Sequence, residues 1–255
     1  MVKSLLTNLV IIYLIACLGL YLMQRSFLYY PQPSYPPNGA DKLTFQNQQQ
    51  KLTGWLVNPG KDKLLFYYGG NAEPVEMNAE FFEAMLPDWS VLLMPYRGYG
   101  VNPGSPTEEG LYSDALFIYD QIADNYQKTA LMGRSLGSGV ATYVASKRDN
   151  NGTILITPYD SIVNVAKEHY RFFPVSWLVK DKYDSISRAP LINKPVLMLI
   201  AANDNIIAPR RSEALAEAFP ADRLLKKVIV NTDHNNIGAS AEYIQSIKSF
   251  LDNIK

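Results

Sequence analysis

Six short apolar segments recur along this chain, and amphipathic stretches of helical length separate most of them. Continuous apolar strands that alternate with helices indicate a parallel sheet covered by helices on both faces. The sequence therefore predicts an α/β fold. The apolar segments are Leu64–Tyr68, Val91–Met94, Thr129–Met132, Thr153–Ile156, Val196–Ile200 and Val228–Val230. The predicted helices cover Glu76–Met85, Ser113–Tyr126, Leu136–Arg148, Arg211–Phe219 and Ala241–Leu251.

Two further segments, Lys42–Gln46 and Leu52–Val57, alternate apolar and polar residues as half-buried antiparallel strands do. With them the predicted sheet has eight strands and is mostly parallel. The stretch at about 161–190 breaks the rhythm and carries bulky apolar residues, among them Phe173 and Trp177. We expect a short insertion over a substrate pocket, with these two side chains in its lining.

Charged residues are absent from residues 4–24, which are predominantly apolar. As a helix this run is about 31 Å long, which matches a hydrocarbon core of roughly 30 Å. It exceeds the apolar region of a signal peptide, and no small-residue cleavage site followed by polar sequence appears. We therefore expect a single N-terminal membrane anchor. Lipidation at Cys17, which ends a lipobox-like Leu14–Cys17, is the alternative.

The expected domain organisation follows from this run. Residues 1–24 form the anchor, residues 25–40 a proline-rich linker that acts as a semi-rigid spacer, and residues 41–255 the α/β domain. Lys3 on one side of the anchor is balanced by Arg25 and Lys42 on the other, so the side of the membrane that holds the domain stays open.

Composition narrows the function classes. The chain has 24 Lys and Arg against 24 Asp and Glu, so it has no excess positive charge to attract nucleic acid. One cysteine excludes an intramolecular disulfide and a cysteine-rich zinc site, and two histidines disfavour a multi-histidine metal centre. The sequence predicts no metal and no cofactor.

A G-x-S-x-G motif spans Gly133–Gly137, directly after one apolar segment and directly before a predicted helix. In this strand–turn–helix setting the serine occupies a strained turn, and side chains at the flanking glycines would collide with neighbouring backbone. The motif therefore predicts Ser135 as a catalytic nucleophile.

A serine hydroxyl needs a histidine base that a carboxylate orients. His234 follows the last apolar segment, and Asp204 follows the segment before it. Because the carboxyl ends of parallel strands meet at one edge of a sheet, both can reach Ser135. Asp160, which follows Thr153–Ile156, is the alternative acid.

An acyl-transfer site also needs N–H donors for the developing oxyanion. The backbone N–H of Leu136, next to the nucleophile, is one predicted donor. The other is expected from the glycine-rich loop after Leu64–Tyr68, where we assign the N–H of Asn71, with Ala72 as the alternative.

At these motifs the chain resembles the α/β-hydrolase superfamily, and within it the branch of small membrane-anchored serine hydrolases that includes protein depalmitoylases. The resemblance implies an α/β-hydrolase fold and an esterase, thioesterase or lipase that acts through an acyl-serine. It covers essentially the whole chain. Its motifs are Gly69–Glu73, Tyr96–Gly100, Gly104–Pro106, Glu109–Leu111, Gly133–Gly137 and Asp233–Asn235.

Three functional hypotheses remain open from the sequence. The first is a membrane-anchored hydrolase of carboxylic esters or thioesters with a lipophilic acyl group, whose substrate is a small molecule, a lipid or an acylated protein. The second is a serine peptidase of the same fold, because fold does not determine substrate. The third is a non-catalytic anchored scaffold.

Overall fold

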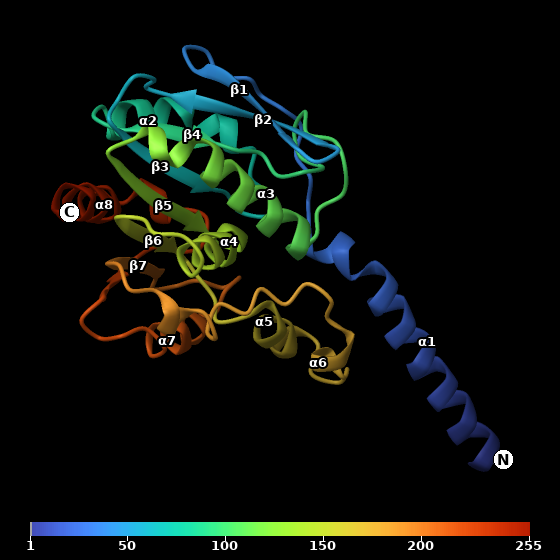
Figure 1. The fold of residues 1–255 in the computed structure, drawn as a ribbon. Helices are drawn as coiled ribbons and strands as arrows, with labels where there is room; N and C mark the ends of the chain where they lie inside the picture. Colours follow the sequence, from blue (N-terminus) through green and yellow to red (C-terminus); the bar gives the residue numbers. More distant parts are fainter. Residues whose placement is uncertain (1) are drawn as a thin grey trace.

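The structure is a computed structural model that describes residues 2–255. Its centre is one eight-stranded sheet with the order β1-β2-β4-β3-β5-β6-β7-β8. Only β2 runs against the other strands: it pairs antiparallel with both β1 and β4, and all other neighbouring pairs are parallel, so the predicted α/β-hydrolase fold is confirmed (Figure 1). The strands are β1 Asp41–Asn47, β2 Gln50–Val57, β3 Lys63–Tyr68, β4 Ser90–Leu93, β5 Lys128–Arg134, β6 Gly152–Ile156, β7 Val196–Ala201 and β8 Leu224–Ile229.

Helices cover both faces of this sheet, and each face has its own apolar core. The side chains of β3 alternate between the two cores, with Phe66 on one face and Leu65 on the other, both buried. The first face is covered by α3 (Glu108–Ile122), α4 (Leu136–Ala145) and α7 (Pro209–Ala216). The second is covered by α2 (Ala79–Met85) and α8 (Ala241–Asn253). Short 3₁₀ helices lie at Val75–Asn78, Ala123–Asn125, Ala189–Leu191 and Ile237–Ala239.

The last strand differs from the predicted segment Val228–Val230. β8 begins at Leu224 and ends at Ile229, and it includes Lys226 and Lys227. It pairs only with β7, as the edge of the sheet, and most of its residues are at least partly exposed. Lysines on an edge strand discourage pairing with other chains, and they also hide the apolar pattern of the strand.

The insertion at 161–190 contains helices that the sequence pattern did not predict. α5 covers Ile162–His169, and α6 covers Val175–Leu178. Ser161 caps α5, because its hydroxyl accepts a hydrogen bond of 3.1 Å from the N–H of Asn164. This helix was missed because it has only eight residues and none is fully buried, although Ile162, Val165 and Ala166 form an apolar face at helical spacing.

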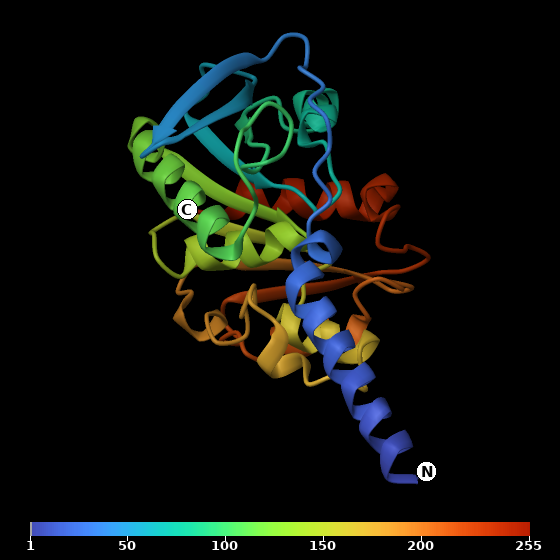
Figure 2. The same ribbon diagram turned by 90° about the vertical axis from the view of Figure 1, so that its right-hand side faces the viewer.

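The N-terminal helix α1 covers Val2–Leu28 and is long and apolar enough to cross a membrane. It extends well beyond the sheet in both views (Figure 1, Figure 2). The chain that follows is attached to the α/β domain and is not a free spacer. The N–H of Tyr30 donates to the carbonyl of Asn71, and the N–H of Gly100 donates to the carbonyl of Gln32. The linker is therefore a strap held beside the 69–73 loop.

A buried ion pair holds the 95–106 loop to helix α3. The guanidinium of Arg97 donates two hydrogen bonds, of 2.7 and 2.6 Å, to the carboxylate of Asp114. Asn47 at the end of β1 donates a third, of 2.8 Å. A second pair on the same helix, Asp120 with Arg148, lies on the surface, where both side chains are more than a third exposed.

Asp114→Ala is expected to lower the free energy of unfolding by about 3 kcal/mol, because it leaves the guanidinium of Arg97 mostly buried without its carboxylate. Asp120→Ala is the matched control and should cost about 0.5 kcal/mol, since water screens an exposed pair. Denaturant unfolding of both variants measures the difference. Equal losses would contradict the assignment of the pair as a structural tie.

Candidate active site

The strand β5 ends in a sharp turn at Ser135, from which helix α4 starts. Ser135 has φ of 50° and ψ of −117°, a conformation that side-chain-bearing residues rarely adopt. The turn is held from the neighbouring strand, because the N–H of Ser135 donates to the carbonyl of Ile156 over 2.9 Å. The hydroxyl of Ser135 is thereby presented above the carboxyl end of the sheet.

The two glycines of the motif are required by space. A Cβ atom at Gly133 would lie much less than 3.0 Å from the carbonyl oxygen of Gly137. A Cβ atom at Gly137 would lie much less than 3.0 Å from the carbonyl oxygen of Tyr68. Both obstacles are backbone atoms, which cannot rotate away as a side chain can. The turn and the approach of α4 to β3 therefore exclude any larger residue at these two positions.

Ser135, His234 and Asp204 form one hydrogen-bonded chain. Nε2 of His234 lies 3.0 Å from Oγ of Ser135, and Nδ1 of His234 lies 2.7 Å from Oδ2 of Asp204. All three side chains are buried. The other oxygen of Asp204, Oδ1, accepts the N–H groups of Ile206 and Ile207 over 2.9 and 2.8 Å, which fixes the carboxylate in place.

The alternative acid, Asp160, is engaged elsewhere. Its Oδ2 accepts hydrogen bonds from Asn164 over 2.7 Å and from Arg211 over 3.0 Å, and its Oδ1 accepts the N–H of Ser161. These contacts tie the start of α5 to α7. Of the two carboxylates, the structure brings Asp204 and not Asp160 to His234.

The predicted oxyanion donors belong to two segments next to the serine. Leu136 is the first residue of α4, and the 69–73 loop passes beside the nucleophile, since a Cβ at Gly70 would lie 3.8 Å from Cβ of Ser135. Within residues 2–255, no hydrogen bond is found for the backbone N–H of Leu136, Asn71 or Ala72. The carbonyl of Asn71 is occupied by the hydroxyl of Tyr99 over 2.7 Å, which holds the loop from behind.

A charge network under the site was not predicted from the sequence. The carboxylate of Glu73 accepts the N–H of Gly70 over 2.7 Å and the guanidinium of Arg134 over 3.1 Å. Arg134 in turn donates to the backbone carbonyl of His234 over 3.1 Å. One network therefore connects the loop of Asn71, the residue before the nucleophile, and the loop of the histidine.

The electrostatics of this network keep its members in the required protonation states. Burial opposes the charge of Arg134, but the facing carboxylate of Glu73 outweighs it and raises the pKa of the guanidinium. Burial also raises the pKa of Tyr67 well above its ordinary value, so its hydroxyl stays protonated and donates to Glu73 over 2.6 Å. The sequence signal for this network was the presence of opposite charges, Glu73 and Arg134, near the carboxyl ends of two strands.

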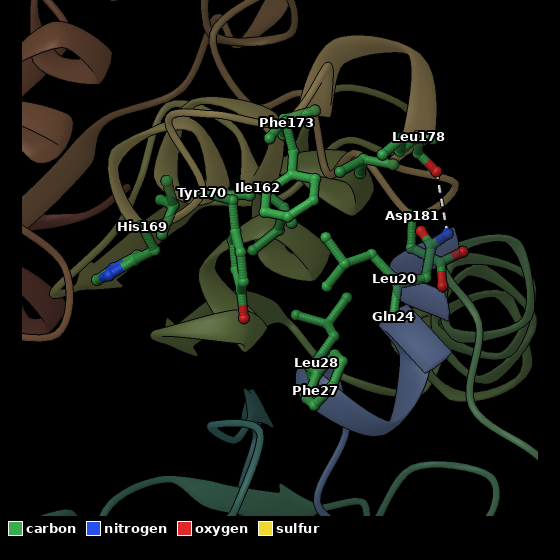
Figure 3. Close-up of a pocket in the computed structure, with 14 residues that line it drawn as sticks. Leu20, Gln24, Phe27, Leu28, Ile162, His169, Tyr170, Phe173, Leu178 and Asp181 are labelled. Carbon is green, nitrogen blue, oxygen red and sulfur yellow. Dashed lines mark hydrogen bonds between the residues drawn. The ribbon is translucent and has the colours of Figure 1, made fainter. Parts of the chain in front are cut away.

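An apolar cavity of about 330 Å³ lies between the insertion and helix α1 (Figure 3). Phe173 lines it, as expected, and so does His169. The expectation for Trp177 is wrong, because its side chain is 88% exposed and is not in the lining. In the short helix α6 the buried residue is Val175. Trp177 follows two residues later, on the opposite side of the helix, so its side chain points outward.

A serine at a strand-to-helix turn of a parallel sheet, joined by hydrogen bonds to a histidine and an aspartate, defines a serine hydrolase of the α/β-hydrolase superfamily. Comparison with known proteins leads to the same class. The chain matches the family described as serine hydrolase (FSH1) over residues 28–235, and it belongs to that family.

Three individual proteins illustrate what the chain is similar to. An uncharacterized protein of Mycobacterium tuberculosis is 32% identical over 228 residues, which are 84% of this chain and 81% of that protein. Lysophosphatidylserine lipase ABHD12 of Danio rerio is 34% identical over 139 residues, but these cover 47% of this chain and 36% of the relative. Among solved structures, the Pyrococcus furiosus esterase Pf2001 superposes with a TM-score of 0.70 at 16% identity, over 88% of this chain and 99% of its own.

Gly137→Ala is expected to lower the free energy of unfolding by about 3 kcal/mol or more, because the added methyl meets backbone that must move. Gly238→Ala is the control, since nothing lies within 4 Å of its added Cβ, and it should stay within about 0.5 kcal/mol of the parent. Thermal or denaturant unfolding separates the two. A tolerated Gly137→Ala would mean that α4 does not approach β3 this closely.

Proposed function

We propose that this protein is a membrane-anchored serine hydrolase that cleaves carboxylic ester or thioester bonds through an acyl-serine intermediate. The observation that carries the proposal is the hydrogen-bonded chain from Ser135 through His234 to Asp204. Two of its three members are held by backbone: the serine by its turn, and the aspartate by two N–H groups. Such preorganised geometry is what nucleophilic catalysis at an acyl carbon requires.

In the first step the hydroxyl of Ser135 attacks the carbonyl carbon while Nε2 of His234 accepts its proton. Asp204 stabilises the resulting imidazolium through Nδ1, and the proton then passes to the leaving alcohol or thiol. A water molecule, deprotonated by the same Nε2, attacks the acyl-serine and releases the acid. His234 thus acts as base and acid in turn.

We assign to the N–H groups of Leu136 and Asn71 the stabilisation of the negative charge that develops on the carbonyl oxygen. Both amides are without a hydrogen-bond partner within residues 2–255, and the loop of Asn71 runs beside the serine. The Glu73–Arg134 pair keeps this loop and the histidine loop at a constant separation. Backbone donors held in this way need no reorganisation during the reaction.

Three observations support a lipophilic acyl group and a membrane location. The cavity beside the insertion is lined mainly by apolar side chains, and α1 has the length and hydropathy of a membrane span. The name of the Danio rerio relative refers to a lipid ester. A serine peptidase of the same fold is the second candidate, but a cavity lined mainly by apolar side chains offers few hydrogen-bonding partners for a peptide backbone. Parallel assays with acyl esters and peptides of matched concentration separate the two.

Ser135→Ala is expected to abolish labelling by a fluorophosphonate probe and to lower turnover of p-nitrophenyl esters roughly 10⁴-fold or more, since only binding and oxyanion stabilisation remain. Ser138→Ala serves as the control within the same helix, because the hydroxyl of Ser138 bonds back to the carbonyl of Ser135 and does not reach His234. Retained activity in Ser135→Ala would refute the nucleophile.

Asp204→Asn is expected to lower kcat about 10³- to 10⁴-fold through loss of the correct imidazole orientation. Asp160→Asn is the matched change in the other buried carboxylate and should reduce kcat far less, because its partners are Arg211 and Asn164. Steady-state kinetics on a short-chain ester rank the two variants. The reverse ranking would move the acid to Asp160.

A further inference from the structure

One face of α1 is packed against the insertion. The residues on that face follow helical spacing: Tyr13, Cys17, Leu20, Gln24 and Leu28. Cys17 is buried, and Leu20, Gln24 and Leu28 line the cavity (Figure 3). Residues on the opposite face, such as Leu22 with 67% exposure, are open. The predicted anchor is therefore also a wall of the cavity.

The insertion follows α1 over a considerable length. At its outer end, the hydroxyl of Tyr13 donates to the carbonyl of Phe172 over 2.9 Å, and the ring of Tyr13 stacks on that of Phe173 with centroids 5.8 Å apart. At its inner end, Arg25 pairs with Asp181 over 2.8 Å. The two ends are 12 residues apart along the helix, or about 18 Å.

This contact determines where a bilayer can lie. The uncharged part of the helix begins after Lys3, and from Ser4 to Tyr13 it is only about 14 Å long, roughly half of a hydrocarbon core. If this uncharged part crosses the bilayer, the outer end of the insertion must enter the bilayer with it. From Ser4 to Tyr21 the helix is about 26 Å long, which is close to the thickness of the core.

The side chains near Tyr21 mark that position as the membrane surface. The ammonium of Lys180 lies 3.9 Å from the centroid of the Tyr21 ring, and lysine and tyrosine are typical of membrane interfaces. Tyr13 lies about 12 Å deeper along the helix. At this depth the insertion presents the side chain of Phe172 outward with 89% exposure. Trp177, also outward with 88% exposure, lies nearer the membrane surface, because the carbonyl of the next residue, Leu178, accepts a hydrogen bond from Gln24.

Arg171, the charged residue next to Phe172, is compatible with a position of the outer end of the insertion in the bilayer. Arg171 turns back, because its Nε donates to the carbonyl of Glu168 in α5 over 3.3 Å. Glu168 itself pairs with Arg210 and Arg211 of the α/β domain. A long arginine side chain that points toward the surface is compatible with burial of its neighbours in lipid.

Helix α1 connects the cavity to the loop beside the catalytic serine. Leu28 lines the cavity, and the carbonyl of Leu28 accepts a hydrogen bond of 3.1 Å from the side chain of Asn71. The loop that carries Asn71 passes beside Ser135. Ser135 itself is not in the lining, so an acyl chain bound at Ser135 enters the cavity past Leu28.

We propose that the outer end of the insertion enters the bilayer beside α1, and that the cavity between them receives the acyl chain of a single-chain ester lipid directly from the bilayer. The inference rests on the proposed function of Ser135. A volume of about 330 Å³ is at the lower end of the usual range for small-molecule sites, which favours one chain over two.

The depth of the insertion is tested with the full chain in phosphatidylcholine vesicles. Trp177 is the exposed tryptophan, while Trp55 and Trp89 are buried at 7% and 3% exposure. Lipid brominated along its acyl chains is expected to quench the tryptophan emission, and Trp177→Phe is expected to remove that quenching. If the wild-type protein and Trp177→Phe respond equally, the insertion lies outside the bilayer and the inference is overturned.

The role of the cavity is tested with two matched changes in α1. Leu20→Trp fills the cavity, whereas Leu22→Trp adds the same side chain to the open face. We expect Leu20→Trp to lower kcat/KM for p-nitrophenyl decanoate in vesicles roughly tenfold or more, since each methylene contributes about fourfold in affinity. Hydrolysis of the acetate should change less than about twofold, and Leu22→Trp should affect neither ester.

A second variant, Ala166→Phe, fills the cavity from the opposite wall and is expected to reproduce the loss. Fluorophosphonate labelling of Ser135 in every variant reports an intact site. If the wild-type protein is labelled but Leu20→Trp and Ala166→Phe hydrolyse decanoate like the parent, only the cavity assignment fails. If the wild-type protein is not labelled, the proposed function itself fails.

Discussion

The strained turn at Ser135 is the constraint on which the rest of the site depends. A serine with φ of 50° at the end of a central strand can be held only by close packing from both sides, and that packing excludes a Cβ at Gly133 and Gly137. Because β5 lies in the middle of a parallel sheet, the turn lies at the edge of the sheet where strands β7 and β8 end and their following loops begin. Asp204 and His234 come from those two loops, and their hydrogen bonds follow from this placement.

The Glu73–Arg134 pair connects the serine turn to the loop that carries a donor of the proposed oxyanion site. Arg134 is the last residue of β5, and Glu73 ends the loop after the adjacent strand β3, so the sheet itself brings the two charges together. Breaking a largely buried pair is costly, since the remaining charge is uncompensated. The loop of Asn71 therefore cannot move independently of the histidine loop, and the strap after α1, which bonds to the carbonyl of Asn71, joins the same unit. In this way helix α1 and Ser135 belong to one connected structure.

Much of this arrangement could be predicted from the sequence, because it depends on local patterns. Apolar runs predict the strands, and the glycine spacing around Ser135 predicts the turn. The missing parts are those that depend on tertiary contact. β8 carries lysines because it is an edge strand, and α5 is a short helix that packs only partly and has no fully buried residue. The direction of Trp177 and the cavity wall formed by α1 depend on how the insertion lies against α1, which neither periodicity nor composition contains.

The central claim is that an acyl group is transferred to Oγ of Ser135, and trapping of that intermediate tests it most directly. A p-nitrophenyl ester is mixed with the wild-type protein, the reaction is quenched in acid within its burst phase, and the peptide that starts at Ser135 is sequenced by mass spectrometry. The account predicts a mass increase equal to one acyl group, located on Ser135, that forms in the burst phase and disappears as hydrolysis is completed. An acyl group on a different residue, or turnover of the ester with no covalent adduct at any time, would contradict it.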